Sequence, residues 1–487
     1  ALLPVLSRFE AQDQRRVRSL LEHMLVYFFV AMIAISGVAF VFAPKLLQLL
    51  VPGIAASSSF GALLLLTRVL LLQPILLGAS NIVANLTQLR HRFLLYSISP
   101  LLYNLGIIAG IIWLYPVIGL RGVVWGVVLG ACLHLLVQLP FFFSEKGGGN
   151  VSWRESWRAL VEVLRLSIPR TLSLAANQIS LAVLVALASF LSAGSIAVFT
   201  LAWNLQAVPL TIIGVSYSVA AFPTLSRLFA GGENSAFVRH LETAVRHIVF
   251  WSVPATVFII VLRAQLVRTI LGAGAFDWTA TRLTAAALAL CVVSLLAQSL
   301  SLLIARAYYA AGDSKKPFMF GLVDVIVSVT SALVLVNTFH TSQFWRYFLE
   351  SLLRVADIPG TTVLMLALAM ALGSIAEFAV GWVYIKRDFA LKPQLIKLFF
   401  ETFSASVIGA AVAYWVLAVV GTHLDIDTAL GVMLQGGLAG ALGLIVTGGM
   451  LWLLNNQELR EALGSLHQRL QPQTSPVVLE PTDVQSN

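Results

Sequence analysis

Residues 24–43, MLVYFFVAMIAISGVAFVFA, contain no charged side chain and decide the class of fold. An α-helix rises 1.5 Å per residue, so twenty residues extend for about 30 Å. That length matches the hydrocarbon core of a bilayer, and a run this long and this apolar is typical of a helix that crosses it. We therefore predict a transmembrane helix here.

The composition of the whole chain agrees with a lipid environment. Of its 487 residues, 59% are hydrophobic and only 11% are charged, whereas a soluble domain carries roughly 25% charged residues. So few charges cannot cover a water-exposed surface of this size. The net charge of +9 would suggest nucleic acid in a soluble protein, but here we assign it to basic loops and expect no nucleic-acid partner.

Eleven further segments resemble residues 24–43 in length and apolarity. The complete set of predicted spans is 24–43, 61–84, 95–115, 120–143, 169–191, 195–222, 245–264, 283–305, 317–337, 361–385, 397–420 and 430–454. The fold class is therefore all-α and polytopic, with twelve complete transmembrane helices. Residues 1–7 read as the stub of one more.

Positive charges orient these spans. Most of the 31 Lys and Arg residues fall in alternate loops, beginning with the loop after residues 1–7. Because basic loops stay on the cytoplasmic side, we predict that both ends of the chain are cytoplasmic.

Two segments do not read as spans. Residues 343–355 place Phe344, Phe348 and Leu352 at helical spacing, which is typical of a short helix lying in the outer membrane interface. The tail from Gln471 to Asn487 is rich in Pro, Ser, Thr and Val, and we expect disorder there.

An internal duplication organises the chain. The segment ALLPVLSRF at residues 1–9 recurs as AAFPTLSRLF at residues 220–229, with Pro4 matching Pro223. Further landmarks recur in the same order at offsets of 214 to 220 residues: Leu46 with Leu266, Thr67-Arg68 with Thr281-Arg282, Arg90 with Arg306, and Pro100 with Pro317. Self-similarity at a fixed period indicates repeated structural units.

Six spans separate Pro4 from Pro223, and an even number gives both copies the same orientation. We therefore predict two parallel six-helix repeats followed by a C-terminal helix pair, an architecture found in transporters with the pathway between the halves. The predicted regions are an N-terminal lobe at 1–145 lacking its first helix, a cytoplasmic linker at 146–166, a C-terminal lobe at 167–390, the added helix pair at 391–455, and a partly disordered cytoplasmic tail at 456–487. With the first helix restored, the expected total is fourteen spans.

An ordered set of motifs then identifies a family. The chain resembles the MurJ/MviN lipid II flippases of the MOP transporter superfamily. The segments that carry this resemblance are ALLPVLSRF, LTQLRHRFLLYSISPLLYN at 86–104, IPRTLSLAANQISLAVLVALASFLSAGSIAVFTLA at 168–202, FPTLSRLF at 222–229 and RAYYAAGDSKKP at 306–317. The resemblance implies a multi-pass protein of the bacterial cytoplasmic membrane that moves an undecaprenyl-pyrophosphate-linked peptidoglycan precursor outward by alternating access.

One departure from the family pattern concerns charge. Most relatives carry an Asp-Arg pair where this chain has Trp203 and Asn204, so one cavity cation is missing. This departure leaves a second hypothesis open, another MOP-type exporter for lipid-linked polysaccharide units or small molecules. A non-transporting scaffold or a multispan glycosyltransferase is the third hypothesis, although the outer loops hold no acidic catalytic motif.

Polar residues in the predicted spans are the candidate functional residues. An anionic headgroup needs a polar, cationic route, because a charge buried without partners costs several kcal/mol. The candidate substrate-binding residues are Arg170, Asn177, Gln178, Asn204, Gln206 and Ser216. Each also has a structural interpretation, as a positive-inside anchor for Arg170 or as a helix–helix hydrogen-bonding residue for the others.

Three further groups lie deep in the apolar runs. Asp324 and Glu377 are candidates for binding a coupling ion, because intramembrane carboxylates are costly and are usually functional. His134, alone in its span, is interpreted as a helix-contact residue, with a proton relay as the alternative.

No enzyme signature is present. The chain has no P-loop, so we expect neither ATP hydrolysis nor any catalytic residue. Cys132 and Cys291 are isolated in apolar runs, which predicts small buried side chains rather than a metal site. We therefore expect no cofactor and no metal, with membrane lipids and a lipid-linked anionic glycan as partners. The coupling ion is left open.

Overall fold

The computed structural model describes residues 2–90, 92–145, 149, 151–391, 395–422 and 428–470. Side chains are described at all of these positions except 3, 4, 93, 166, 169, 170, 172–177 and 465–470. Within these ranges every regular element is a helix, which confirms the all-α prediction. The chain divides into two compact units: unit 1 is Ala1–Ala197 with Gly321–Leu333, and unit 2 is Val198–Phe320 with Val334–Asn487.

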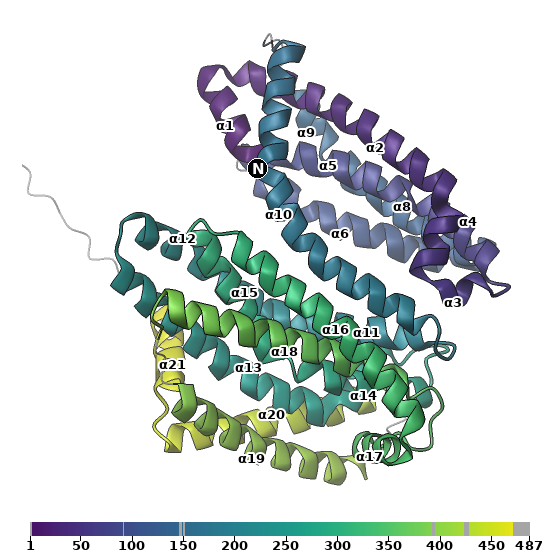
Figure 1. The fold of residues 1–487 in the computed structure, drawn as a ribbon, viewed down its shortest axis with the longest axis vertical. Coiled ribbons are helices and arrows are strands. Elements are labelled where there is room, and N and C mark those ends of the chain that lie inside the picture. Colours follow the sequence, from purple (N-terminus) through teal and green to yellow (C-terminus); the bar gives the residue numbers. More distant parts are fainter. Residues whose placement is uncertain are drawn as a thin grey trace, which may run out of the picture. The chain divides into compact units, whose positions relative to one another are not determined.

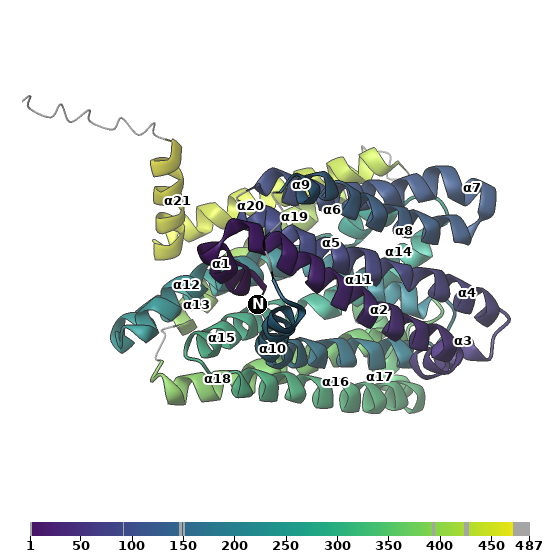
Figure 2. The same ribbon diagram turned by 90° about the horizontal axis from the view of Figure 1, so that it is seen from above.

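Unit 1 is built from the first ten α-helices and one π-helical segment (Figure 1). They are α1 (Leu2–Gln12), α2 (Gln14–Leu50), α3 (Pro52–Ala55), α4 (Phe60–Leu70), α5 (Leu72–Leu89), α6 (Phe93–Ala109), η1 (Gly110–Leu114), α7 (Tyr115–Ile118), α8 (Leu120–Leu136), α9 (Leu139–Ser144) and α10 (Trp153–Ala188). Helices α2, α5 and α8 run side by side in both views (Figures 1 and 2).

Glycines let α8 approach α6 and η1 at backbone contact. A Cβ atom on Gly106 would lie 2.3 Å from the Cα of Gly130, and one on Gly126 would lie 2.5 Å from the Cα of Gly110. Gly122, one turn before Gly126, packs against the backbone of Leu114. In lipid there is little hydrophobic drive for helix association, so small residues at four-residue spacing hold helices together through close packing.

The apolar core of unit 1 lies at the end of α2 that carries Arg15, Arg16 and Arg18. Leu20 and Leu21 of α2 are fully buried there against Val83 and Leu86 of α5. Helix α2 has 37 residues and therefore extends for about 55 Å, well beyond the hydrocarbon core. Its first turns, which carry Arg15, Arg16 and Arg18, are therefore proposed to continue outside the apolar layer.

Unit 2 contains the remaining helices. They are α11 (Ser195–Leu210), η2 (Thr211–Val215), α12 (Ser216–Ala230), α13 (Asn234–Leu271), α14 (Trp278–Val292), α15 (Leu295–Ala310), α16 (Lys315–Thr341), α17 (Gln343–Leu353), α18 (Val363–Asp388), α19 (Leu395–Gly421), α20 (Ala429–Leu453) and α21 (Gln457–Leu470). Residues 321–333 of α16 group with unit 1. Helices α19 and α20 lie side by side, and α21 turns away from α20 (Figure 2).

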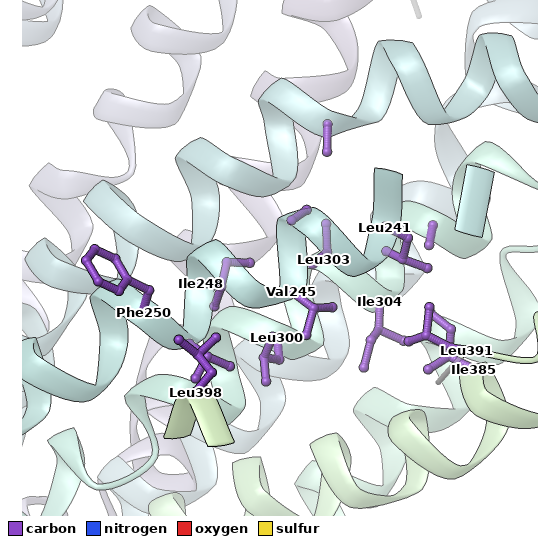
Figure 3. Packing of buried hydrophobic residues seen from close by; sticks show 14 of the residues in the cluster. Leu241, Val245, Ile248, Phe250, Leu300, Leu303, Ile304, Ile385, Leu391 and Leu398 are labelled. Atoms are coloured by element: carbon purple, nitrogen blue, oxygen red, sulfur yellow. The ribbon is translucent and has the colours of Figure 1, made fainter. Parts of the chain in front are cut away.

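Helix α13 organises the core of unit 2. Its buried residues, including Leu241, Val245 and Ile248, face Leu303 and Ile304 of α15 (Figure 3). These positions recur every three or four residues, so α13 presents one continuous apolar stripe. Leu391 and Leu398, on either side of the start of α19, complete the cluster.

The membrane spans follow the predicted segments. Among the described residues, ten helices or helix pairs are long and apolar enough to cross a bilayer, and α14 with α15, bent by 45° at their junction, makes an eleventh. The remaining prediction, 169–191, falls in α10, where Gln178–Ala188 is a shorter apolar helix. Several side chains of α10 lie outside the described part, so about ten or eleven spans are established and the twelfth stays a prediction.

The segments outside the spans also bear on the predictions. Residues 343–353 form the separate helix α17, which confirms that this segment is helical. Helix α10 begins at Trp153, inside the segment predicted as a linker. Residues 471–487 lie outside the described residues, so the predicted disorder there stays a prediction.

Candidate functional site

Helix α10 carries the first three candidate residues. The Ser152 side chain accepts a hydrogen bond from the Glu155 backbone N–H at 3.2 Å and so caps the start of the helix. The side chains of Arg170 and Asn177 lie outside the described part of the structure. Gln178 is exposed on the helix.

The next candidates lie on α11, and the helix separates them. Asn204 is exposed, whereas Gln206 is 1% exposed. Two residues correspond to about 200° around an α-helix, so these amides point in opposite directions. Neither the Oε1 nor the Nε2 atom of Gln206 has a hydrogen-bond partner among the described residues. A buried amide without partners is costly, which makes Gln206 the most unusual polar group of this helix.

A π-helical segment follows these two residues. Helix α11 contains Pro209, and η2 begins two residues later at Thr211. Ser216 is exposed, and its Oγ atom donates a hydrogen bond to the Thr211 carbonyl at 3.1 Å. A Cβ on Gly214 would lie 2.8 Å from the Cα of Ser299 on α15, so η2 is held tightly against that helix. Single π-helical turns of this kind occur often at functional sites.

The two intramembrane carboxylates occupy different settings. Asp324 of α16 is 8% exposed, and Glu377 of α18 is half-buried. Each has an interaction partner, so neither is an isolated charge in the bilayer. Asp324 belongs to unit 1 and Glu377 to unit 2.

Arg306 on α15 is a candidate that the sequence alone did not single out. The guanidinium carbon lies 5.6 Å from the ring centroid of Phe222 on α12. Arg306 is half-buried, and in the described part of the chain no carboxylate lies within 4.0 Å of it. Arg306 is the first residue of the motif RAYYAAGDSKKP. The positive-inside pattern accounts for its charge as a loop anchor, so the sequence gives no separate reason to place it in a binding site.

The matching arginine of the proposed duplication, Arg90, has the opposite environment. Its Nε and Nη2 atoms donate to the two Glu145 carboxylate oxygens at 2.9 and 3.0 Å, and its Nη1 atom pairs with Glu10. The Arg90 and Glu145 side chains are 17% and 16% exposed. This cluster joins the ends of α1, α5 and α9 and leaves no free positive charge at Arg90.

His134 is also satisfied within unit 1. Its Nδ1 atom lies 2.7 Å from Ser80 Oγ, and Gln138 donates to the same hydroxyl at 3.0 Å. This network links α5 to α8, as the helix-contact interpretation predicts. No group of three His, Cys, Asp or Glu side chains is placed to hold a metal ion in the part of the chain described.

Comparison with known proteins decides the family. The family model described as "Lipid II flippase MurJ" matches residues 1–430. The chain belongs to the MurJ lipid II flippase family. It is accordingly a multi-pass membrane transporter and not an enzyme, and the motif-based prediction of the family is confirmed.

Curated MurJ relatives match at modest identity. A probable lipid II flippase MurJ from Thermotoga maritima is 26% identical over 381 residues, which cover 77% of this chain and 67% of that protein. The lipid II flippase MurJ of Burkholderia cenocepacia is 23% identical over 344 residues, covering 69% of this chain and 67% of that protein. A Haemophilus influenzae relative is 29% identical but matches only 48% of each chain. The chain thus aligns with between half and two thirds of these relatives.

Solved structures show the same fold. The likeness to a lipid II flippase MurJ in an inward closed conformation has a TM-score of 0.70 at 19% identity and covers 93% of this chain and 90% of that one. An inward-facing multidrug resistance MATE transporter of the MOP superfamily matches with a TM-score of 0.62 at 16% identity, covering 79% of this chain and 84% of that one. The MurJ fold of this chain is therefore shared with MATE transporters.

Proposed function

We propose that this chain moves lipid II, the undecaprenyl-pyrophosphate-linked peptidoglycan precursor, from the inner to the outer leaflet of the bacterial cytoplasmic membrane by alternating access. The observation that carries the proposal is the match of the MurJ family model over residues 1–430. The MurJ-like fold supports it. Both chain ends are proposed to be cytoplasmic, because the basic loops lie on that side.

The proposed architecture is two parallel six-helix repeats and a C-terminal helix pair. Helix α2 has 37 residues and α13, its proposed counterpart, has 38. The span after each is divided in two, as α4 with α5 and as α14 with α15. These parallels support the duplication, and α10 would supply the twelfth span.

The central groups of the proposed substrate route are polar side chains on α11 and α15 that have no carboxylate or amide partner among the described residues. Asn204 is exposed, Gln206 is buried without partners, and Arg306 has no carboxylate near it within the described residues. We assign the pyrophosphate to the Arg306 guanidinium, because a planar guanidinium offers paired donors to phosphate oxygens. Arg170, Asn177, Gln178 and Ser216 are proposed to contact the headgroup along the same route.

Energy for transport is proposed to come from an ion gradient or the membrane potential. One elementary charge moved across the membrane yields about 2.3 kcal/mol per 100 mV. Asp324 and Glu377 are the proposed coupling groups. Replacing each by its amide, Asp324→Asn and Glu377→Gln, should slow transport while leaving the protein folded, and normal transport by both variants would remove them from the mechanism.

The proposal is tested in cells of the source organism. Depletion of the protein should reduce the lipid II that is accessible at the outer leaflet, and re-expression of the wild-type chain should restore it. Lipid II exposure that is unchanged after depletion would contradict the proposal. Re-expression of Arg306→Gln under the same conditions tests the headgroup assignment.

A second candidate function is export of another substrate of the MOP type. It is favoured by Trp203 and Asn204, where most relatives carry an Asp-Arg pair, and by the fold shared with MATE transporters. Under this alternative, depletion would leave lipid II exposure intact and would raise cellular accumulation of a cationic dye.

A further inference from the structure

A pocket at one end of unit 2 gathers three arginines. It has a volume of about 570 Å³ and lies between α13, α14, the C-terminal end of α17 and α19. Arg263, Arg282 and Arg354 line it together with Trp278 and Tyr414. The predicted topology places this end, which holds the loop between α13 and α14, on the outer face of the membrane.

Each arginine reaches the pocket from a different element. Arg263 of α13 donates to the Leu353 carbonyl at 3.3 Å and to the Ile260 carbonyl at 3.3 Å. Arg282 of α14 forms a bidentate pair with Asp357, with both Nη···Oδ distances at 2.7 Å. These contacts fix the two guanidinium groups at the ends of separate helices.

Arg354 is held in an unusual backbone conformation. It ends α17 with φ 59° and ψ 47°, the left-handed region that usually belongs to Gly or Asn at a helix end. From there its Nη2 atom donates to the Tyr414 hydroxyl at 3.2 Å, and its backbone carbonyl accepts from Arg282. A non-glycine residue keeps such a costly backbone conformation only where surrounding contacts hold it there. At this position the Arg354 side chain also adds a positive charge to the pocket.

The charges of the pocket do not balance. Asp357 pairs with Arg282, and this hydrogen bonding lowers the pKa of the Asp357 carboxyl, so it is ionised at neutral pH. Within the described residues, no carboxylate lies within 4.0 Å of Arg263 or Arg354. The nearby Glu350 is committed to Arg346 and to the Thr361 hydroxyl. In the part of the chain that the structure describes, the pocket therefore carries two positive charges that no carboxylate compensates.

Helix α17 indicates the depth of the pocket in the membrane. Its side chains Phe344, Tyr347 and Leu352 are 80%, 62% and 62% exposed. A short helix with so apolar an exposed face is typical of the membrane interface, and Trp and Tyr, like those in the pocket wall, favour the same level. Lipid phosphates lie at this depth.

We propose that this pocket binds the phosphate headgroup of an anionic phospholipid in the outer leaflet. The guanidinium groups of Arg263 and Arg354, which have no carboxylate partner among the described residues, suit a phosphodiester because a guanidinium offers paired donors to phosphate oxygens. The apolar wall formed by Ile260, Val261 and Leu417 suits the start of the acyl chains. Basic pockets between membrane helices are a recurrent form of lipid headgroup site. None of the residues that line this pocket belongs to the proposed substrate route, which uses residues of α10, α11, α12 and α15.

The test uses the purified full chain in a neutral detergent. Binding of phosphatidylglycerol, of phosphatidylcholine with the same acyl chains, and of inorganic phosphate is measured by native mass spectrometry and by the shift of the thermal unfolding midpoint. We expect phosphatidylglycerol to bind and to raise the midpoint, with little effect from phosphatidylcholine. Stabilisation by inorganic phosphate at the same concentration would overturn the lipid assignment, and equal binding of the two lipids would overturn the role of charge.

Substitutions test the residues. The double variant Arg263→Gln/Arg354→Gln leaves the Arg282–Asp357 pair in place and should weaken phosphatidylglycerol binding by about tenfold or more, as expected for the loss of charge-assisted contacts. The matched control is Arg121→Gln, an exposed arginine of unit 1 at the outer end of α8, which should bind as the wild type does. Unchanged binding by the double variant contradicts the proposal.

A variant with the opposite effect separates lost binding from lost folding. Asp357→Asn removes the one carboxylate that competes with the lipid for Arg282, so phosphatidylglycerol should bind more tightly, by a few-fold. A misfolded protein would not bind more tightly. If Asp357→Asn binds more weakly than the wild type, the pocket is not an anion site.

Discussion

The two units use arginines at corresponding positions of the proposed duplication in different ways. At the end that is proposed to be outer, Arg68 of unit 1 lies over the Phe40 ring at 4.5 Å and lines an apolar cavity of about 790 Å³ between α2 and α4, whereas Arg282 of unit 2 pairs with Asp357 in the three-arginine pocket. At the end that is proposed to be cytoplasmic, Arg90 is neutralised by two glutamates, whereas no carboxylate among the described residues pairs with Arg306. Repetition of a sequence landmark therefore preserves the position of a charge but not its partners.

The difference suggests a division of work. In unit 1, Arg90 joins the ends of three helices through two carboxylates, and in unit 2 the corresponding Arg306, with no carboxylate partner among the described residues, is proposed to bind an anion. Glu10 and Glu145 neutralise Arg90 from the ends of α1 and α9. A duplicated sequence need not keep carboxylates at the matching positions of unit 2. The following substitutions test the contrast.

The largest expected effect is at the glycine contact of unit 1. Gly126→Val should lower the free energy of unfolding by about 3 kcal/mol or more, because its Cβ would lie 2.5 Å from the Gly110 Cα and the backbones must separate. SDS-induced unfolding in mixed micelles measures the loss.

The matched control for this change is Gly449→Val on α20 of unit 2. A Cβ at Gly449 meets nothing within 4 Å, so the control should unfold much like the wild type. Equal losses from both valines would show that the α6–α8 contact has no special role.

The next effect concerns the inner end of unit 1. Arg90→Gln leaves Glu10 and Glu145 half-buried and unpaired, and we expect a loss of about 2 kcal/mol in the free energy of unfolding. The same titration measures it. Restoration of stability by the double variant Arg90→Gln/Glu145→Gln would confirm that unpaired charge, rather than lost packing, is the cause.

The corresponding change in unit 2 should act on transport instead of stability. Arg306→Gln removes one half-buried cation–π contact with Phe222, which contributes about 1 kcal/mol, but it also removes a proposed phosphate ligand. We expect lipid II export to fall by about tenfold, which corresponds to one charge-assisted contact. Outer-leaflet lipid II in complemented cells gives the readout.

The exposed Arg227 on α12 provides the control, since Arg227→Gln should export normally. If Arg306→Gln exports normally and destabilises the protein as strongly as Arg90→Gln does, the proposed division between the units is wrong.

The smallest effect concerns the pH dependence of the Arg282–Asp357 pair. The lowered pKa of Asp357 means that the pair's stabilisation is present above the ordinary carboxyl pKa of about 3.9 and is lost only as the pH falls through the lowered value. The difference in thermal midpoint between the wild type and Asp357→Asn should thus be the same at pH 7 and pH 5. At about pH 3.9, where an ordinary carboxyl is half-protonated, most of this difference should remain, and loss of half or more of it there would show that the pKa of Asp357 is not lowered.

Much of the fold could be predicted from the sequence, because each apolar segment that lies in hydrocarbon must satisfy its own backbone hydrogen bonds by forming a helix. Residues 24–43 had to form a helix that faces lipid, since an unsatisfied backbone is too costly in hydrocarbon, and the same reasoning located α13, α16 and α18. The family followed from motif order. The bend between α14 and α15 and the π-helical turn η2 did not follow, because both depend on packing against neighbouring helices.

The candidate site was less predictable. The sequence identified Gln206 as polar, but only the structure shows that its amide is buried and without partners among the described residues. It identified Arg306 as positive but assigned it to a loop, and it gave no reason to group Arg263 with Arg354, which are 91 residues apart along the chain.

The sequence by itself determined that this protein is a polytopic α-helical membrane protein of the MurJ family. Those properties depend on the length, apolarity and order of segments, which each stretch of chain carries alone. Only the tertiary structure decided which charges are neutralised and which are free. An ion pair such as Arg90 with Glu145, or its absence at Arg306, depends on distances of a few ångströms between helices that are distant in the sequence.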